Sequence, residues 1–514
     1  MIQPANRVTE IQEYYFSRKL KEVAKLNAEG KDIISLAIGS PDMPPSKQTI
    51  DKLCEVANNP NAHGYQPTVG IPELRKAMAG FYKRWYDVDL DWATEIQPLI
   101  GSKEGILHVT LAFCNPGDEV LIPNPGYPTY TAINKILGTK ITYYDLREDN
   151  GWQPDFDALE KMDLSHVKLM WTNYPNMPTG GVAKRETYEK LVAFAQKHNI
   201  VVVNDNPYSL ILNEHPMSIM QVPGAKDCCI EFNSLSKSHN MPGWRVAMIS
   251  SNKTFISWIL KVKSNIDNGS FRGIQLAAAE AMLNNTDEWH RENNIQNYRR
   301  RRDIAEEIMK VLDCQFDPNQ VGMFLWGKIP EKYADVEDLT EKVLHEARVF
   351  ITPGFIFGTN GKRYIRISLC AKDEKMKEAL ERIRSPDAQT AVAFGCGPQL
   401  PRLLPHLRRN VPRHLPRLRR AGQRVARRAG AFSGAFGRGS FDRTAHPGRH
   451  AAGDHRQRLH RQFSELRFGN GLYLSHQTPQ FGARLAQRFR KPGSAHRPLT
   501  GFLTDRPFAA GILS

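Results

Sequence analysis

Short runs of β-branched and apolar residues recur along the middle of this chain and alternate with amphipathic stretches. The expected strands lie near residues 119–122, 168–173, 200–204, 228–232 and 246–250. Residues 184–199, between two of these runs, have the apolar spacing of one helix face. Strands that alternate with helices are typical of a mostly parallel sheet with helices on both faces. The sequence therefore predicts an α/β fold.

Composition changes abruptly after residue 384. Residues 385–514 hold 22 arginines, one lysine and five acidic residues, a net charge of +18, whereas the whole chain carries +16. The first 384 residues are therefore nearly neutral, which argues against nucleic-acid binding by this part. The tail mixes arginine, proline, glycine and histidine without a sustained helical or alternating period. We expect it to be a disordered or non-native extension.

Targeting and metal signals are missing from the sequence. No apolar run reaches about 18 residues, so we expect no membrane span. The start, Met1 to Asn6, lacks the charged and then apolar order of a signal peptide. The seven cysteines have no Cys-x-x-Cys spacing, a pattern that favours reduced thiols in the cytoplasm and no metal site.

Lys237 lies between two predicted strands, and we expect it on a tight loop between two sheet edges. Ser234 and Ser236 precede it, and Arg245 follows eight residues later. Lysine forms Schiff bases with carbonyl groups, while serine and arginine donors suit a phosphate. A surface lysine in a polar loop is the alternative. The segment predicts a site for a covalently held phosphorylated aldehyde.

An acid ends the β-branched run at residues 201–203. Asp205 lies at the carboxyl end of this predicted strand, where open α/β sheets bind ligands, and Tyr208 follows three residues later. A carboxylate there can keep a pyridine nitrogen protonated, and a phenol can donate to an oxygen on the same ring. A turn or helix-cap acid is the alternative interpretation of Asp205.

Two further segments have residues that suit ligand binding, one for an anion and one for a flat ring. Gly101 and Ser102 begin a predicted helix, whose free N–H groups and dipole favour an anion. The expected buried face of this helix is formed by Ile106, Leu107, Thr110, Leu111 and Cys114. Tyr127 lies on a proline-stiffened loop after a predicted strand, where its ring could stack on a heterocycle.

In this order, these segments resemble the class I and II aminotransferases, the fold type I family that depends on pyridoxal 5'-phosphate (PLP). The resemblance covers roughly residues 10–384. It implies that Lys237 binds the cofactor covalently and moves a proton at the substrate Cα. Asp205 would pair with the pyridinium nitrogen, Tyr208 with the 3-oxygen of the ring, and Tyr127 would stack on the ring.

The resemblance also implies a phosphate site, a substrate clamp and a dimer. The phosphate would be held by Ser102 and Lys103, through backbone N–H groups and the Ser102 hydroxyl, and by Ser234, Ser236 and Arg245. Tyr65 looks like the family's tyrosine that contacts the phosphate of the neighbouring subunit, so a homodimer is expected. Arg366 matches the arginine that binds the substrate α-carboxylate, and Gly39 would close over it.

One position departs from the family pattern. The family usually carries asparagine directly before Pro-Thr-Gly, where it donates to the 3-oxygen of PLP, whereas this chain has Met177 before Pro178. A thioether cannot donate, so either Asn176 takes over this role or Tyr208 carries it alone. The loss of one hydrogen bond is worth about 1 kcal/mol and should tune the pH profile without abolishing activity.

We expect a large PLP-binding domain at residues 40–285 and a smaller α/β domain at 286–384, to which the N-terminal arm, residues 1–39, contributes. Residues 72–86 have the apolar spacing of a core-facing helix with proline in its first turn. A further helix is expected at residues 373–384. The four consecutive arginines Arg299 to Arg302 are interpreted as a solvated helix face.

The resulting hypothesis is an aminotransferase that moves an amino group from an α-amino acid to a 2-oxo acid through the PLP and pyridoxamine phosphate forms, a double displacement. Relatives specific for dicarboxylates carry a second arginine for the side-chain carboxylate, and this chain has no clear counterpart, since Arg272 lies late in its loop. A neutral donor such as alanine, methionine or an aromatic amino acid is therefore expected. Diaminopimelate is a further possibility. The alternatives are a PLP-dependent lyase such as a carbon–sulfur lyase, and a polyanion-binding protein that acts through the basic tail.

Truncation after Arg384 tests the interpretation of the tail. Because the tail lacks the apolar content to pack on the enzyme, its removal should leave PLP binding, dimerisation and kcat within about twofold. Binding to polyanions that depends on salt should disappear, because the +18 charge leaves with these residues. Hydrogen exchange should find the tail unprotected in the full chain. Unfolding of the truncated enzyme would contradict this interpretation.

Overall fold

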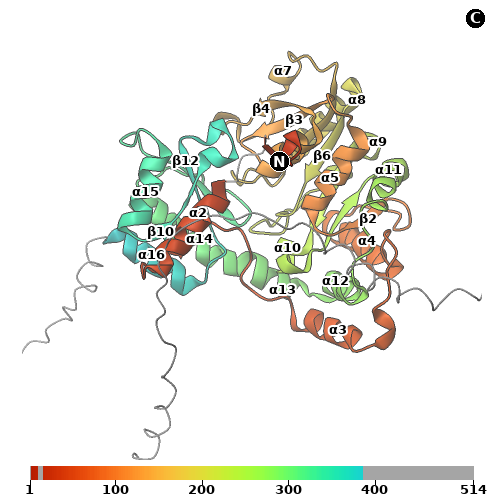
Figure 1. Ribbon diagram of the computed structural model, residues 1–514, viewed down its shortest axis with the longest axis horizontal. Helices are drawn as coiled ribbons and strands as arrows, with labels where there is room; N and C mark the ends of the chain where they lie inside the picture. Colours follow the sequence, from red (N-terminus) through yellow and green to blue (C-terminus); the bar gives the residue numbers. More distant parts are fainter. Residues whose placement is uncertain (1, 10–14, 386–514) are drawn as a thin grey trace, which may run out of the picture. The chain divides into compact units, whose positions relative to one another are not determined.

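The computed structural model describes residues 2–9 and 15–385 (Figure 1). All of these residues belong to one compact unit, and a second unit, Pro405–Ser514, lies outside the described residues. The expectations for the tail at residues 386–514 therefore also lie outside them. Among the helices of the described residues, none is long and apolar enough to cross a membrane.

Seven strands form the principal sheet, in the order β2-β8-β7-β6-β5-β3-β4. Their bounds are β2 Ile96–Leu99, β3 Glu119–Asn124, β4 Lys140–Asp145, β5 Val167–Thr172, β6 Val201–Asp205, β7 Cys229–Ser234 and β8 Ala247–Ser250. The pairs from β4 to β7 are parallel, and β8 runs antiparallel to both of its neighbours. The five strands predicted from sequence are all present, and the α/β prediction is confirmed.

Helices connect these strands and cover the sheet (Figure 1). The α-helices are α1 Asn6–Thr9, α2 Tyr15–Ala28, α3 Lys47–Ala57, α4 Pro72–Tyr86, α5 Ser102–Phe113, α6 Pro128–Leu137, α7 Phe156–Leu159, α8 Arg185–His198, α9 Ala225–Cys228, α10 Leu235–Ser238, α11 Lys253–Lys263, α12 Arg272–Asn284, α13 Asp287–His290, α14 Asn297–Val311, α15 Val336–Glu346 and α16 Asp373–Arg384. The helices predicted at 72–86 and 373–384 begin and end at those residues. The stretch 184–199 forms α8, which is one residue shorter at each end.

Side chains of the central strands point alternately to two hydrophobic cores. On one face Trp171, Val203 and Phe232 pack with residues of α5 and α11. On the other face Met170 and Val202 pack with residues of α4 and α8. Successive side chains of a strand point to opposite faces, so a strand covered by helices on both faces is apolar throughout. This explains the continuous β-branched runs in the sequence.

Two smaller sheets lie outside the principal sheet. One is antiparallel, in the order β11-β12-β9, with β11 Thr352–Pro353, β12 Tyr364–Ser368 and β9 Phe324–Lys328. The other pairs β1 Ile34–Ser35 in parallel with β10 Val349–Phe350. The N-terminal segment thus pairs with a late part of the chain. The division into domains at residues 39 and 285 stays a prediction.

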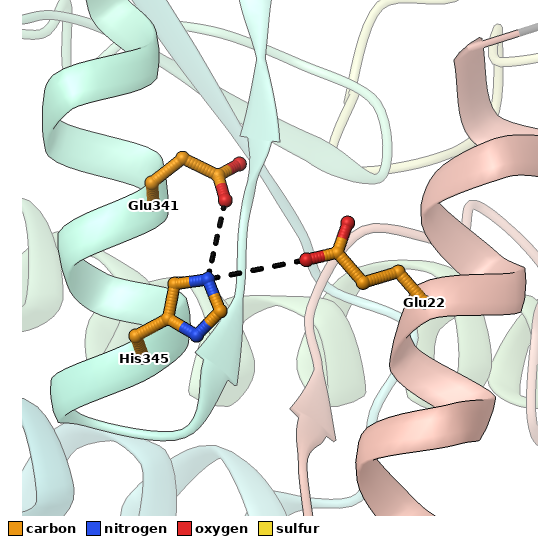
Figure 2. A group of neighbouring side chains, drawn as sticks. All are labelled: Glu22, Glu341 and His345. Atoms are coloured by element: carbon orange, nitrogen blue, oxygen red, sulfur yellow. Dashed lines mark ion pairs between the residues drawn. The ribbon is translucent and has the colours of Figure 1, made fainter.

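A cluster of charged side chains joins the N-terminal helix α2 to α15 (Figure 2). His345 Nε2 lies 3.4 Å from Glu341 and 3.9 Å from Glu22. Lys19 Nζ lies 2.5 Å from Glu341 and 2.9 Å from Glu22. Because an ammonium group already bridges the two carboxylates, the cluster is an ion-pair network between α2 and α15.

The interpretation of the four arginines in α14 as a solvated face is wrong for two of them. Arg299 and Arg300 are exposed, but Arg301 and Arg302 are buried. Arg301 donates to both carboxylate oxygens of Asp42, at 2.7 and 3.0 Å, and to Asp373 at 3.1 Å. Arg302 donates to the backbone carbonyl groups of Asp317, Pro318 and Gln320. Burial is tolerated because both guanidinium groups are paired.

Removal of the Arg301 guanidinium should destabilise the protein. In Arg301→Ala, Asp42 and Asp373 lose their buried partner, and we expect the free energy of unfolding to fall by about 3 kcal/mol. Denaturant unfolding of the cofactor-free protein measures this change. Arg299→Ala is the matched control, because Arg299 is exposed on the same helix, and its effect should stay below about 0.5 kcal/mol. Equal stability of the two variants would contradict a supporting role for Arg301.

Candidate functional site

A pocket of about 500 Å³ opens at the carboxyl ends of the parallel strands. Asp205 is the last residue of β6, Ser234 is the last residue of β7, and Asn173 directly follows β5. The residues predicted from sequence that line the pocket are Gly39, Ser102, Lys103, Tyr127, Asp205, Tyr208, Ser234, Ser236, Lys237, Arg245 and Arg366. The structure therefore brings together eleven of the twelve predicted site residues, and Tyr65 is the exception.

Lys237 points its amine into this pocket from a short helix. It lies on α10, a single turn between β7 and β8, and these strands are interior to the sheet. The expectation of a loop between two sheet edges is therefore wrong, because β2 continues the sheet beyond β8. Lys237 Nζ donates to the carbonyl oxygen of Gly39 at 2.6 Å. Burial, together with the positive charges of Arg366 and Arg245, lowers the pKa of Lys237 and favours a neutral, nucleophilic amine.

Asp205 is a buried carboxylate with one free oxygen. Its Oδ2 accepts a hydrogen bond from the Tyr130 hydroxyl at 2.8 Å. Its Oδ1 has no hydrogen-bond partner among the described residues. Burial raises the pKa of Asp205 to about 6, although the Tyr130 hydrogen bond and the charge of Lys237 oppose this shift. A protonated ring nitrogen would satisfy Oδ1 and favour the ionised carboxylate.

The opposite end of the pocket has the donors that a phosphate needs. Ser102 is the first residue of α5, which follows Gly101 at a φ of 82°. A Cβ at Gly101 would overlap the Arg245 guanidinium, so glycine permits their close approach. Ser234 caps α10 by accepting from the Ser236 N–H at 3.2 Å. A helix N-terminus, hydroxyl groups and a guanidinium together suit a phosphate dianion.

Arg366 lies among aromatic rings, in an environment that suits binding of a carboxylate. It lies in β12 and donates to the Ala37 carbonyl oxygen at 2.8 Å and to the Met177 sulfur at 3.2 Å. The centroids of the Phe324 and Phe357 rings lie 4.0 and 4.6 Å from its Cζ. These rings limit access of water to the guanidinium, which strengthens its attraction for an anion.

Gly39 is required beside this clamp. A Cβ there would overlap the ring of Phe324, which packs against Arg366. The close approach of this backbone segment also brings the Gly39 carbonyl to Lys237. The structure thus places Gly39 between the predicted nucleophile and the predicted carboxylate clamp.

The segment around Met177 bears on the alternative that the sequence left open. Asn176 Oδ1 accepts from the Thr179 hydroxyl at 2.8 Å, and Asn176 is not among the described residues that line the pocket. Met177 and Asn173 line it instead. Asn176 thus lies outside the pocket lining, and the contact of the ring oxygen with Asn176 or with Tyr208 stays a prediction.

Several pocket residues were missed from sequence. Asn173, which lines the pocket, donates to the Asp205 carbonyl oxygen at 2.6 Å, and Tyr130, which lies outside the lining, donates to the Asp205 carboxylate. The rule that identified Asp205, a polar residue at the end of a buried strand, applies equally to Asn173. The aromatic residues Phe16, Phe324 and Phe357 come from distant segments and carry no local motif.

Tyr65 lies away from the pocket of its own chain. The residue is 92% exposed and is not among the described residues that line the pocket. A residue that contacts a neighbouring subunit has to be accessible in a single chain, so the exposure of Tyr65 is compatible with the expected role. That role stays a prediction.

Comparisons with known proteins agree with the PLP site that the pocket geometry suggests. Residues 31–383 match the family described as aminotransferase class I and II. A relative from Dehalococcoides mccartyi, named LL-diaminopimelate aminotransferase, is 38% identical over 387 residues, which are 75% of this chain and 99% of the relative. A relative of the same name from Aquifex aeolicus is 40% identical, with the same coverage of both chains.

Solved structures agree on the fold. The substrate-bound structure of BacF from a Bacillus species has a TM-score of 0.71 and 35% identity, and the match covers 75% of this chain and 98% of BacF. A probable N-succinyldiaminopimelate aminotransferase from Thermus thermophilus has a TM-score of 0.67 and 32% identity, and covers 72% of this chain and 99% of its own. With the pocket geometry, these matches show that the chain belongs to the class I and II aminotransferases and is a PLP-dependent enzyme of fold type I.

Proposed function

We propose that this aminotransferase takes LL-diaminopimelate as its amino donor and a 2-oxo acid as acceptor. The observation that carries this proposal is the name of the relatives, which are 38–40% identical to this chain over 97–99% of their own length. The comparisons do not confirm the neutral amino donor expected from sequence, since these relatives are named for a dicarboxylic diamino acid.

The expectation of a neutral donor depended on the lack of a second arginine. Arg272 does lie outside the pocket lining, and it pairs with Glu73 at 3.0 Å. However, a second carboxylate needs a cation and not specifically an arginine. Lys103 is exposed and lines the pocket. A lysine ammonium can pair with a carboxylate, so Lys103 is the candidate partner for a distal carboxylate of the donor.

The residues of the pocket would have separate roles in the transfer of the amino group. PLP, when bound, supplies an electrophilic carbon and a ring that accepts electrons. Arg366 would hold the α-carboxylate of the substrate and so orient its Cα–H bond toward Lys237. The Lys237 amine, whose pKa is lowered, would take the proton from Cα and return it at the cofactor carbon. Asp205 would keep the ring nitrogen protonated, and Tyr127 would stack on the ring.

We propose that the enzyme is a homodimer in which Tyr65 contacts the phosphate bound by the partner subunit. Tyr65 is exposed, and its segment pairs with the loop after α11 through the bridge between Gln66 and Gly269. This backbone pairing fixes the position from which the phenol projects. A phenol hydroxyl can donate to a phosphate oxygen.

Replacement of Lys237 should remove both cofactor attachment and proton transfer. Lys237→Ala should lose the visible absorption of the bound cofactor and slow turnover by several orders of magnitude. Lys237→Arg should fail as well, because a guanidinium stays charged and forms no imine. Absorption spectra after dialysis and single-turnover kinetics measure the two effects. Lys47→Ala is the control, because the Lys47 side chain is 87% exposed and its partner Asp51 is 59% exposed. Retention of both properties in Lys237→Ala would refute the assignment.

Replacement of Asp205 should separate binding from chemistry. Asp205→Ala should still bind PLP, because the phosphate donors remain, yet Cα deprotonation should slow by several orders of magnitude when the ring nitrogen is no longer protonated. Asp205→Glu keeps a carboxylate and should be milder. Equal rates of the donor half-reaction in wild type and Asp205→Ala, followed by stopped-flow absorption, would exclude this role.

A panel of amino donors tests the proposed substrate. LL-diaminopimelate should have a kcat/KM at least about tenfold above those of alanine, methionine, phenylalanine and aspartate. With donor alone, a transaminase releases one equivalent of oxo acid per subunit and then stops, whereas a lyase continues to turn over. Preference for a neutral donor would overturn the proposed substrate and leave the transaminase assignment intact. Continued turnover without an acceptor would favour the lyase.

A further inference from the structure

A buried ionic network lies beneath the proposed phosphate site. It consists of Glu104 and His108 on α5, Lys263 at the end of α11, and Asp267 in the loop that follows α11. Lys263 Nζ lies 2.5 Å from Glu104 Oε1 and 2.6 Å from Asp267 Oδ1. His108 Nε2 lies 2.6 Å from Glu104 Oε1 and 3.2 Å from Asp267 Oδ2. A lysine and a histidine thus share the same two carboxylates.

The network is well shielded from water. The side chains of Lys263 and His108 are 2% and 0% exposed, and those of Glu104 and Asp267 are 19% exposed. Burial disfavours the charged form of Glu104, but hydrogen bonds from His108 and Lys263 outweigh it and lower the pKa of Glu104 to about 2. The ammonium group of Lys263 occupies the space between the carboxylates, so the four side chains form an ion-pair network and not a metal site.

One end of the network fixes the turn that begins α5. Glu104 Oε2, the oxygen not used by Lys263, accepts from the Ile100 N–H at 2.9 Å. The next two residues are Gly101, which packs against Arg245, and Ser102, which lines the pocket. The Glu104 carboxylate therefore connects Lys263 directly to the backbone that presents the helix N-terminus to the pocket.

The other end fixes the segment that carries Tyr65. The Thr68 hydroxyl donates to the Asp267 carbonyl oxygen at 3.3 Å. Two residues beyond Asp267, the Gly269 N–H donates to the Gln66 carbonyl oxygen at 3.2 Å. The loop after α11 thus pairs with the residues directly after Tyr65.

Buried ion pairs seldom add net stability, because desolvation cancels most of the attraction between the charges. Their directional hydrogen bonds nevertheless fix geometry. We propose that Glu104, His108, Lys263 and Asp267 form a positioning network that holds the turn Ile100–Ser102 in register with the Tyr65 segment. The network thereby sets the affinity of the enzyme for the phosphate group of its cofactor. The inference rests on the phosphate roles proposed above for Ser102 and Arg245.

Binding to the cofactor-free enzyme tests this proposal without measuring turnover. Lys263→Met removes the shared ammonium group, and Glu104→Gln weakens the link to Ile100. Each variant is titrated with PLP, with pyridoxal, which lacks the phosphate, and with inorganic phosphate. We expect PLP and inorganic phosphate to bind about tenfold more weakly, because the donors are displaced. Pyridoxal affinity should stay within about twofold, because Lys237 and Asp205 are untouched.

Lys47→Met is the matched control. Lys47 and Asp51 form an ion pair with the same spacing and the same 2.6 Å distance as Lys263 and Asp267, but they are 87% and 59% exposed. This variant should bind all three ligands as wild type does. Asp267→Asn keeps the shape of the side chain and provides a second test if Lys263→Met does not fold.

Three outcomes would overturn the proposal. These are equal weakening of PLP and pyridoxal, unchanged affinity for all three ligands, and a fall in the thermal midpoint with no change in phosphate affinity. A wild-type enzyme that binds PLP no more tightly than pyridoxal would instead refute the phosphate roles of Ser102 and Arg245. These binding measurements use no amino donor, so they do not depend on the proposed substrate. The panel of amino donors tests that substrate separately.

Discussion

Parallel pairing of the central strands is the constraint on which the rest of the structure depends. Because β3, β5, β6 and β7 run in one direction, their carboxyl ends meet at one edge of the sheet. Asp205 and Ser234 end two of these strands and line the same pocket, although 28 residues of sequence separate them. The reversal at β8 then returns the chain after Lys237, so that Arg245 reaches the pocket as well.

The electrostatics of the pocket follow from this arrangement. Burial makes a lone carboxylate costly and raises the pKa of Asp205 to about 6, whereas burial and two nearby guanidinium groups lower the pKa of Lys237. Each shift opposes the charge that the residue carries in water. A cationic ring nitrogen beside Asp205 and a carbonyl carbon at Lys237 relieve both penalties, so the pocket is prepared for one particular type of ligand.

Ion pairs that are buried away from the pocket hold segments of the chain in position. Arg301 bridges Asp42 and Asp373, and Lys263 bridges Glu104 and Asp267. Each joins segments far apart in sequence, where apolar packing alone would hold position less strictly. Sequence patterns do not identify such residues. The arginine run in α14 looked like a solvated face, and the predicted buried face of α5 omitted His108, which is fully buried, and included Leu111, which is 39% exposed.

Local periodicity predicted five strands of the principal sheet and the helices at residues 72–86 and 373–384. The sequence motifs, with the family resemblance that they carry, also pointed to eleven residues that line one pocket. Tertiary structure decided what depends on distant contacts. Phe324 packs against Arg366, Tyr130 holds Asp205, and Ala37 accepts a hydrogen bond from Arg366 across 329 positions of sequence. The comparisons do not confirm the neutral amino donor that was expected from the lack of a second arginine. Contacts between residues far apart in the sequence leave no local pattern, since only the folded chain brings them together.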